Sequence, residues 1–146
     1  MIKNIKENRV SRTYRGGANI DRFFGKENPE NTFYPEDWTA SATSAYNSKD
    51  NKVEGIGITC DGEPIPQLIG GNRFPLLVKL LDSAERLVIQ AHPTVPFAKA
   101  FLNSEYGKTE CWYFLDCRED ACVYIGFREG VSRREWEQAF YRNDSE

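Results

Sequence analysis

Three residues in one short region have side chains that could bind a metal ion. Gln90, His92 and Glu110 lie within RLVIQAHPTVPFAKAFLNSEYGKTECWYFLD, residues 86–116, and His92 is the only histidine among the 146 residues. An amide oxygen, an imidazole nitrogen and a carboxylate are suitable ligands for zinc or a similar divalent ion. Alternatively, His92 forms a hydrogen bond at a strand end and Gln90 satisfies a neighbouring group. The spacing alone favours this second interpretation, because the Gln-x-His pattern is short and common.

Two predicted strands could bring these side chains together. Alternate residues of a strand share a face, so Gln90 and His92 project from the same side of a strand predicted in residues 86–93. A second strand, predicted in residues 108–116, places Glu110 on one face with two aromatic residues. If the two strands pair, Glu110 approaches His92, and we expect all three side chains on the inner face of the sheet.

Further strands indicate a mainly β fold. The run RFPLLVKLLD, residues 73–82, has the length and composition of a buried strand, and Lys79 interrupts it. Residues 52–65 are typical of a strand followed by an Asp61-Gly62 turn, and residues 121–127 form another short apolar run. Several short strands separated by turns predict an antiparallel sandwich or barrel.

Two helices are predicted beside these strands. Phe97, Ala98, Phe101 and Leu102 have helical spacing after a proline at residue 96, with a glycine at residue 107 beyond the end. Near the C-terminal end, Ser132 and Glu135 have the spacing of a capping box. That second helix carries an apolar stripe of Trp136, Ala139 and Phe140.

Length and charge exclude several classes of protein. A chain of 146 residues is long enough for one packed domain and short for two, and its net charge of −3 argues against nucleic-acid binding. The basic stretch KNIKENRVSRTYR, residues 3–15, is the exception, and such runs are usually a solvated segment or a strand edge. No apolar run approaches the roughly 20 residues of a membrane span. We therefore predict a soluble, cytoplasmic protein with no nucleic-acid or membrane partner.

The four cysteines do not indicate a metal site. Cys60, Cys111, Cys117 and Cys122 include no Cys-x-x-Cys pair. Cys117 and Cys122 flank a predicted hairpin turn and could cross-link, but a cytosolic compartment would keep them reduced. We interpret all four as thiols without a specific function.

Several motifs in order resemble those of a known family. FPLLVKLLDSAERLVIQAHP, GKTECWYFLD and ACVYIGF are similar to the catalytic domain of class I mannose-6-phosphate isomerases, as are NRVSRTYRGGANIDRFFG and PEDWTASATSAYN nearer the N-terminus. These enzymes are zinc-dependent cupins that interconvert mannose 6-phosphate and fructose 6-phosphate. The resemblance implies a cupin-like jelly roll, an aldose-ketose isomerase activity that proceeds through an enediol, and a sugar phosphate substrate.

The resemblance also assigns roles to individual residues. Gln90, His92 and Glu110 match the family's metal ligands, and Lys79 and Lys108 match its catalytic and substrate-binding lysines. Glu36 matches a polar residue that lines the substrate site, whereas Trp38 is expected in the core. Alternatively, Lys79 extends to the barrel mouth and Lys108 is an exposed turn lysine.

The chain also departs from the family pattern. Val88 stands where the family usually has serine, and the family supplies a further histidine ligand and an arginine from later segments of longer chains. We therefore expect residues 1–146 to be a single cupin-type domain, truncated at its C-terminal end, with weakly held zinc and with strand edges that self-associate. The alternative function is a non-catalytic cupin fragment that binds a sugar phosphate or a partner chain.

Overall fold

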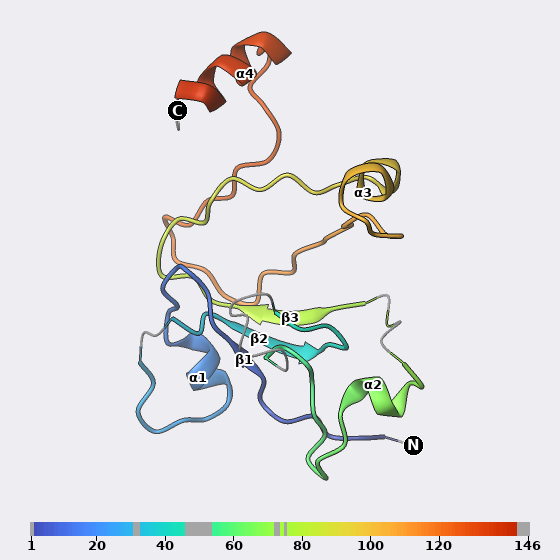
Figure 1. Ribbon diagram of the computed structural model, residues 1–146. Helices are drawn as coiled ribbons and strands as arrows, with labels where there is room; N and C mark the ends of the chain where they lie inside the picture. Colours follow the sequence, from blue (N-terminus) through green and yellow to red (C-terminus); the bar gives the residue numbers. More distant parts are fainter. Residues whose placement is uncertain (1, 31–32, 46–53, 72–73, 75, 143–146) are drawn as a thin grey trace. The chain divides into compact units, whose positions relative to one another are not determined.

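The computed structural model describes residues 2–30, 33–45, 54–71, 74 and 76–142. The chain divides into two compact units, Met1–Ala91 and His92–Glu146, and each unit is described by itself. The first unit holds three strands and two helices, and the second holds two helices, all within the described residues (Figure 1).

The first unit is built on a small antiparallel sheet. Its strands β1 (Arg9–Val10), β2 (Glu36–Ala40) and β3 (Val78–Leu81) lie in the order β1-β2-β3. Glu36 pairs with Val10 on one side and with Leu81 on the other. The central position of β2 therefore gives Glu36 a neighbouring strand on each side.

The core of the first unit surrounds Trp38. Val10, Trp38 and Ala45 form a cluster of buried side chains. Gly55 has a φ of +91°, and a Cβ atom there would lie 2.8 Å from Cε3 of Trp38. Only glycine fits this close approach without strain, because it has no Cβ and adopts positive φ readily. The prediction that Trp38 belongs to the core is confirmed.

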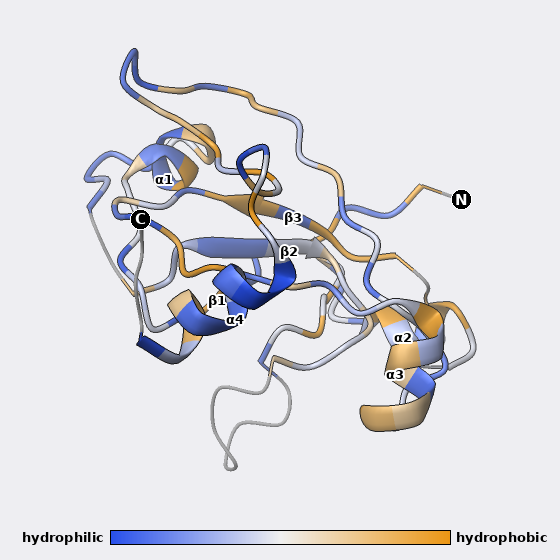
Figure 2. Ribbon diagram, turned by 90° about the horizontal axis from the view of Figure 1, so that it is seen from above, coloured by the Kyte–Doolittle hydropathy of each residue, from blue (hydrophilic) through white to orange (hydrophobic). Residues whose placement is uncertain are grey.

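Two short helices flank the sheet at opposite ends, α1 (Asn19–Phe23) and α2 (Ile65–Leu68) (Figures 1 and 2). The N-cap residue of α1 forms no side-chain hydrogen bond with the helix. Instead, the Asp82 carboxylate, which directly follows β3, accepts a hydrogen bond of 2.6 Å from the Asn19 backbone nitrogen. A residue distant in sequence therefore accepts the hydrogen bond of a backbone N–H group at the start of α1.

The second unit begins with α3 (Val95–Phe101), and the predicted helix is confirmed. The Thr94 hydroxyl accepts a hydrogen bond of 3.4 Å from the Phe97 backbone nitrogen. After the helix, the Lys108 backbone nitrogen donates to the Pro93 carbonyl at 3.0 Å. Gly107 allows this approach, because a Cβ atom there would lie only 2.6 Å from the Pro93 oxygen. Gly107 thus permits the backbone contact between Lys108 and Pro93, and it does not cap the helix.

The helix α4 (Arg133–Arg142) confirms the second helix prediction. The Glu135 carboxylate accepts from the Ser132 backbone nitrogen at 2.8 Å, and the Glu135 backbone nitrogen donates to the Ser132 hydroxyl at 3.3 Å. These reciprocal contacts form the expected capping box. Trp136 stacks on Phe140 with ring centroids 5.8 Å apart.

The strand predictions have mixed outcomes. Within residues 73–82 the strand β3 forms, and Figure 2 shows its hydrophobic residues in orange. Residues 73 and 75 lie outside the described residues, as do 52 and 53 of the predicted strand 52–65. The rest of that segment forms only bridges, Ile5 with Thr59 and Ile58 with Pro64. Its predicted turn is present, since Thr59 and Glu63 are hydrogen-bonded across Asp61-Gly62.

Three predicted strands are wrong in the described chain, those in residues 86–93, 108–116 and 121–127. No strand is formed there, and several of their apolar side chains are exposed, including Val88 at 78% and Ile125 at 90%. A strand persists only where a neighbour takes its hydrogen bonds, and none of these segments has such a neighbour among the described residues. The predicted β class is represented by one antiparallel sheet, and the jelly roll stays a prediction.

In the part of the chain that the structure describes, no helix combines the length and the apolar character that crossing a membrane requires.

Candidate functional site

Glu36 is a buried carboxylate surrounded by donors. Its Oε2 atom accepts from Arg12 Nη2 at 3.0 Å and from Trp38 Nε1 at 2.7 Å. Its Oε1 atom accepts from the Tyr14 hydroxyl at 2.6 Å and lies 3.6 Å from Lys79 Nζ. The Glu36 side chain is only 4% exposed. This group of polar residues, Arg12, Tyr14, Glu36, Trp38 and Lys79, is called the Glu36 cluster below.

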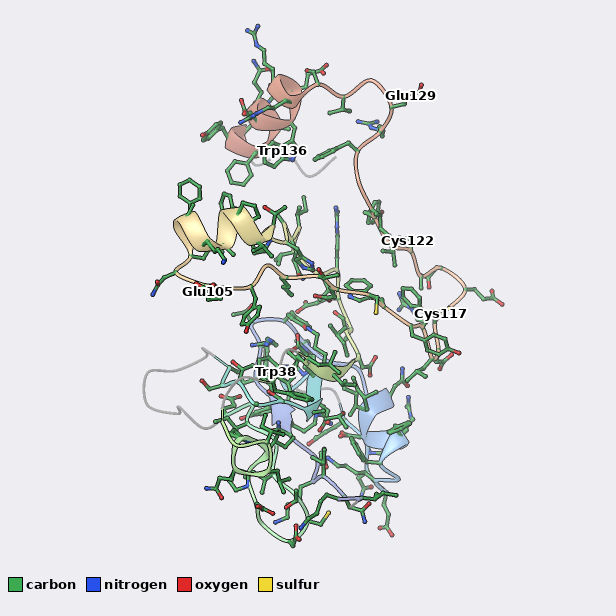
Figure 3. All side chains as sticks on the ribbon, turned by 90° about the vertical axis from the view of Figure 1, so that its right-hand side faces the viewer. Trp38, Glu105, Cys117, Cys122, Glu129 and Trp136 are labelled. Carbon is green, nitrogen blue, oxygen red and sulfur yellow. The ribbon has the colours of Figure 1, made fainter. Side chains whose placement is uncertain are left out.

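The strands explain how the Glu36 cluster assembles. Glu36 and Trp38 are two residues apart on β2, so their side chains share one face. Lys79 comes from the neighbouring strand β3, and Arg12 and Tyr14 follow β1. Figure 3 shows Trp38 among the crowded side chains of the first unit. The small sheet therefore gathers residues that are far apart in the sequence.

The cluster keeps Glu36 ionised. Burial by itself raises the pKa of a carboxyl group, because it disfavours the charged form. The hydrogen bonds from Arg12, Tyr14 and Trp38, together with the Lys79 charge, outweigh this effect and lower the pKa of Glu36 to about 2. The pKa of Tyr14 is raised well above its usual range, first by burial and then by its hydrogen bond to Glu36. Tyr14 therefore remains a hydrogen-bond donor at physiological pH.

A second polar group lies in the second unit. Glu110 Oε2 is 3.6 Å from His92 Nε2 and 3.1 Å from Lys108 Nζ. The other oxygen, Oε1, accepts a hydrogen bond of 2.5 Å from Trp112 Nε1. The backbone contact between Lys108 and Pro93 explains the meeting, because it places residues 108–110 beside His92. The side chains of His92, Lys108, Glu110 and Trp112 are called the Glu110 cluster below.

His92 and Glu110 have a separation suited to a shared metal ion. In a tetrahedral zinc site with bond lengths of about 2.1 Å, neighbouring donor atoms lie about 3.4 Å apart. The observed separation of 3.6 Å between His92 Nε2 and Glu110 Oε2 fits this geometry. No group of three or more histidine, cysteine, aspartate or glutamate side chains suited to a metal occurs among the described residues.

The predicted site residues thus fall into two groups. The structure brings Glu36 together with Lys79 in the first unit, and His92 together with Glu110 and Lys108 in the second. Gln90 belongs to the first unit and is exposed. Its role as a ligand stays a prediction.

Sequence reasoning missed Arg12 and Tyr14. They lie in the basic stretch that was interpreted as a solvated segment or strand edge, and β1 is indeed an edge strand. However, Arg12 forms an ion pair with buried Glu36, and its guanidinium carbon lies 5.0 Å from the centre of the Trp38 ring. The signal that could have identified them is the spacing of Arg12 and Tyr14, two residues apart, which places both on one face of an extended chain.

The cysteines are all free thiols. Cys60, Cys111, Cys117 and Cys122 are exposed and form no disulfide. Figure 3 shows Cys117 and Cys122 on the extended chain of the second unit. The predicted hairpin between them is wrong, since residues 121–127 form no strand.

Comparisons with known proteins identify relatives along most of the chain. The sequence model described as "Phosphomannose isomerase type I, catalytic domain" matches residues 7–111. The chain is 35% identical over 134 residues to GmuF of Bacillus subtilis (strain 168), named a probable mannose-6-phosphate isomerase, covering 88% of this chain and 42% of GmuF. The mannose-6-phosphate isomerase of Streptococcus mutans serotype c is 32% identical over the same shares of the two chains.

A third relative matches a shorter region. ManA of Bacillus subtilis (strain 168), a mannose-6-phosphate isomerase, is 40% identical over an alignment of 80 residues that covers 49% of this chain and 25% of ManA. No solved structure matches the chain significantly. The chain spans about two fifths of the length of its longer-matching curated relatives. Since the family match covers residues 7–111, the chain belongs to the type I phosphomannose isomerase family, within its catalytic domain.

Proposed function

We propose that this chain is part of a metal-dependent mannose-6-phosphate isomerase, which interconverts mannose 6-phosphate and fructose 6-phosphate. Family membership supports the reaction class, because the relatives carry that name. The observation that carries the proposal is the Glu110 cluster, where an imidazole and an ammonium group both lie within 3.6 Å of one carboxylate.

Gln90, His92 and Glu110 are the residues that would hold the ion, which we propose to be zinc. When bound, such an ion supplies Lewis-acid polarisation of a substrate oxygen. Lys108 lies against Glu110 and adds a positive charge that would attract an anionic substrate. Because one ligand is a neutral amide, we expect this chain to hold zinc weakly.

Lys79 and Glu36 belong to the same proposal, because Glu36 lies beside the partly exposed ammonium group of Lys79. The Lys79 side chain is 22% exposed, and it lies next to a carboxylate that remains charged. We propose that Lys79 and Lys108 contact the sugar phosphate, and that the proton moves between adjacent carbons through an enediol. We further propose a cupin fold for the intact domain and a cytoplasmic location.

Zinc titration of the purified chain by calorimetry tests the proposed metal site. His92→Ala removes the only nitrogen donor of the proposed zinc site, so we expect zinc binding to be lost. Cys111→Ala is the matched control, since it removes a potential zinc-binding thiol next to Glu110 and should leave the affinity unchanged. Zinc binding that survives His92→Ala, or that is lost in Cys111→Ala, would contradict the assignment.

An isomerase assay on the same preparation tests the reaction. We expect little or no turnover of mannose 6-phosphate by the 146-residue chain, because the relatives it matches are more than twice as long. Robust turnover that persists after His92→Ala would overturn the proposed role of this site.

A further inference from the structure

Three hydrogen bonds and one ion pair from the protein surround the Glu36 carboxylate. An ionised carboxylate offers about four lone-pair positions. In the described residues, Arg12 and Trp38 contact Oε2, while Tyr14 and Lys79 contact Oε1. The Glu36 side chain is also only 4% exposed, so any role it has is exerted through the side chains that contact it.

The four contacts are not equivalent. The contacts from Arg12, Tyr14 and Trp38 are 2.6 to 3.0 Å long and qualify as hydrogen bonds. The Lys79 nitrogen lies 3.6 Å from Oε1, which is an ion-pair distance too long for a hydrogen bond. Glu36 thus attracts the Lys79 charge without forming a close hydrogen bond to its ammonium protons.

The other three donors hold the carboxylate in place. Trp38 is 6% exposed and part of the core, and Arg12 lies over its ring. Both sides of β2 are paired, so the backbone of Glu36 is fixed as well. A carboxylate held this firmly can restrain a flexible lysine, whose side chain otherwise samples many rotamers.

We propose that Glu36 is a positioning residue, which holds the Lys79 ammonium in place to receive the anionic group of the substrate. This inference rests on the proposed function for the identity of that substrate, a sugar phosphate. It assigns Glu36 an indirect role, in which Lys79 contacts the ligand and Glu36 acts through Lys79.

A double-mutant cycle on the full chain measures this coupling. Calorimetry would give the affinity for mannose 6-phosphate of the wild type, Glu36→Gln, Lys79→Met and the double variant. We expect Glu36→Gln to weaken binding about tenfold, since an amide lacks the charge that restrains Lys79. The double variant should bind within twofold of Lys79→Met alone, because Glu36 has no effect once its target is removed. Independent effects that multiply in the double variant would overturn the proposal.

Nuclear magnetic resonance of the lysine side-chain ¹⁵N nuclei gives a readout that does not need the substrate. We expect a restrained Lys79 ammonium in the wild type and a mobile one in Glu36→Gln. Tyr14→Phe removes a donor from the same carboxylate oxygen, so it should also change the Lys79 signal if Glu36→Gln fails to fold. The matched control is Asp61→Asn, which breaks the exposed ion pair of Lys3 in the same unit and should leave Lys79 unchanged.

The two measurements separate the inference from the proposed function. If Lys79 mobility depends on Glu36 but the wild-type chain does not bind mannose 6-phosphate, the proposed substrate is wrong and the positioning role stands. If Lys79 is equally mobile in the wild type, Glu36→Gln and Tyr14→Phe, the positioning role is wrong whatever the chain binds.

Discussion

Glu36 shows how one buried charge can organise a site. Its carboxylate is almost fully removed from water and would be costly to bury alone. Hydrogen bonds from Arg12, Tyr14 and Trp38 compensate, and they favour the ionised form so strongly that the pKa falls to about 2. Removing the charge should therefore affect both the stability of the first unit and the position of Lys79.

The pH dependence of stability should depend on Glu36. Its folded-state pKa of about 2 lies below the ordinary value of 4.5, so its stabilising contribution is present above pH 4.5 and is lost as the pH falls toward 2. This shift corresponds to a contribution on the order of 3 kcal/mol. Chemical unfolding at pH 5 and pH 2 should show a smaller loss of stability in Glu36→Gln than in the wild type. Equal losses in the two proteins would contradict the lowered pKa.

His92 and Glu110, which we propose as metal ligands, were correctly predicted to lie close together, but for a wrong reason. The sequence indicated that His92 and Glu110 approach each other on neighbouring strands. They do lie 3.6 Å apart, but neither segment is a strand in the described structure. A backbone hydrogen bond between Lys108 and Pro93 holds the two segments beside each other, and alternation of side chains could not reveal it. Arg12 and Tyr14 were missed because their partner Glu36 is distant in sequence.

At the scale of elements, the helices α3 and α4 were predictable, whereas α1, α2 and most strands were not. The caps of α3 and α4 come from Thr94 and from Ser132 with Glu135, which lie within three residues of the groups they contact. Local sequence therefore carries the signal. The helix α1 was missed because its first backbone nitrogen is satisfied by Asp82, more than 60 residues away.

Strand prediction failed because pairing is not local. The apolar runs in residues 86–93, 108–116 and 121–127 have strand composition but no partner among the described residues. Conversely, β2 contains the buried charges Glu36 and Asp37, so hydrophobicity did not identify it. Pairing with β1 and β3, together with the contacts of the Glu36 side chain, determines the conformation of β2.

Gly107 is expected to control the metal site through the backbone. In Gly107→Ala, the added Cβ would lie 2.6 Å from the Pro93 oxygen, so the contact between Lys108 and Pro93 must open. We expect at least a tenfold loss of zinc affinity, measured by calorimetry, although His92 and Glu110 remain. Gly126→Ala is the control, because the Cβ atom added there would have no atom within 4 Å, so any change it causes would come from its positive φ of +75° and not from a clash. Unchanged zinc affinity in Gly107→Ala would refute this account of how the pair forms.

At the scale of the whole molecule, the resemblance to the isomerase family was more informative than the strand pattern. The motifs predicted a family that the comparisons confirm over residues 7–111. The complete architecture could not be predicted in the same way, because it depends on long-range pairing. Two compact units and one small sheet are what the described residues form.

Exposed apolar side chains lead us to expect self-association. Trp136 and Phe140 of α4 are 41% and 66% exposed, and β1 is an edge strand. Sedimentation velocity over a wide concentration range should show species larger than a monomer. Phe140→Glu should weaken this association, whereas Gln138→Glu, which adds the same charge elsewhere on α4, should not. A strictly monomeric wild-type chain at every concentration would show that the prediction is wrong.

The most direct test of the central claim is isomerase activity in a hybrid protein. The matched 88% of this chain would replace the corresponding part of GmuF, and the hybrid would be assayed for conversion of mannose 6-phosphate to fructose 6-phosphate. We predict zinc-dependent activity that is abolished by His92→Ala and retained in Cys111→Ala. A folded hybrid without activity, or one whose activity survives His92→Ala, would contradict the claim that this chain supplies the metal site of a mannose-6-phosphate isomerase.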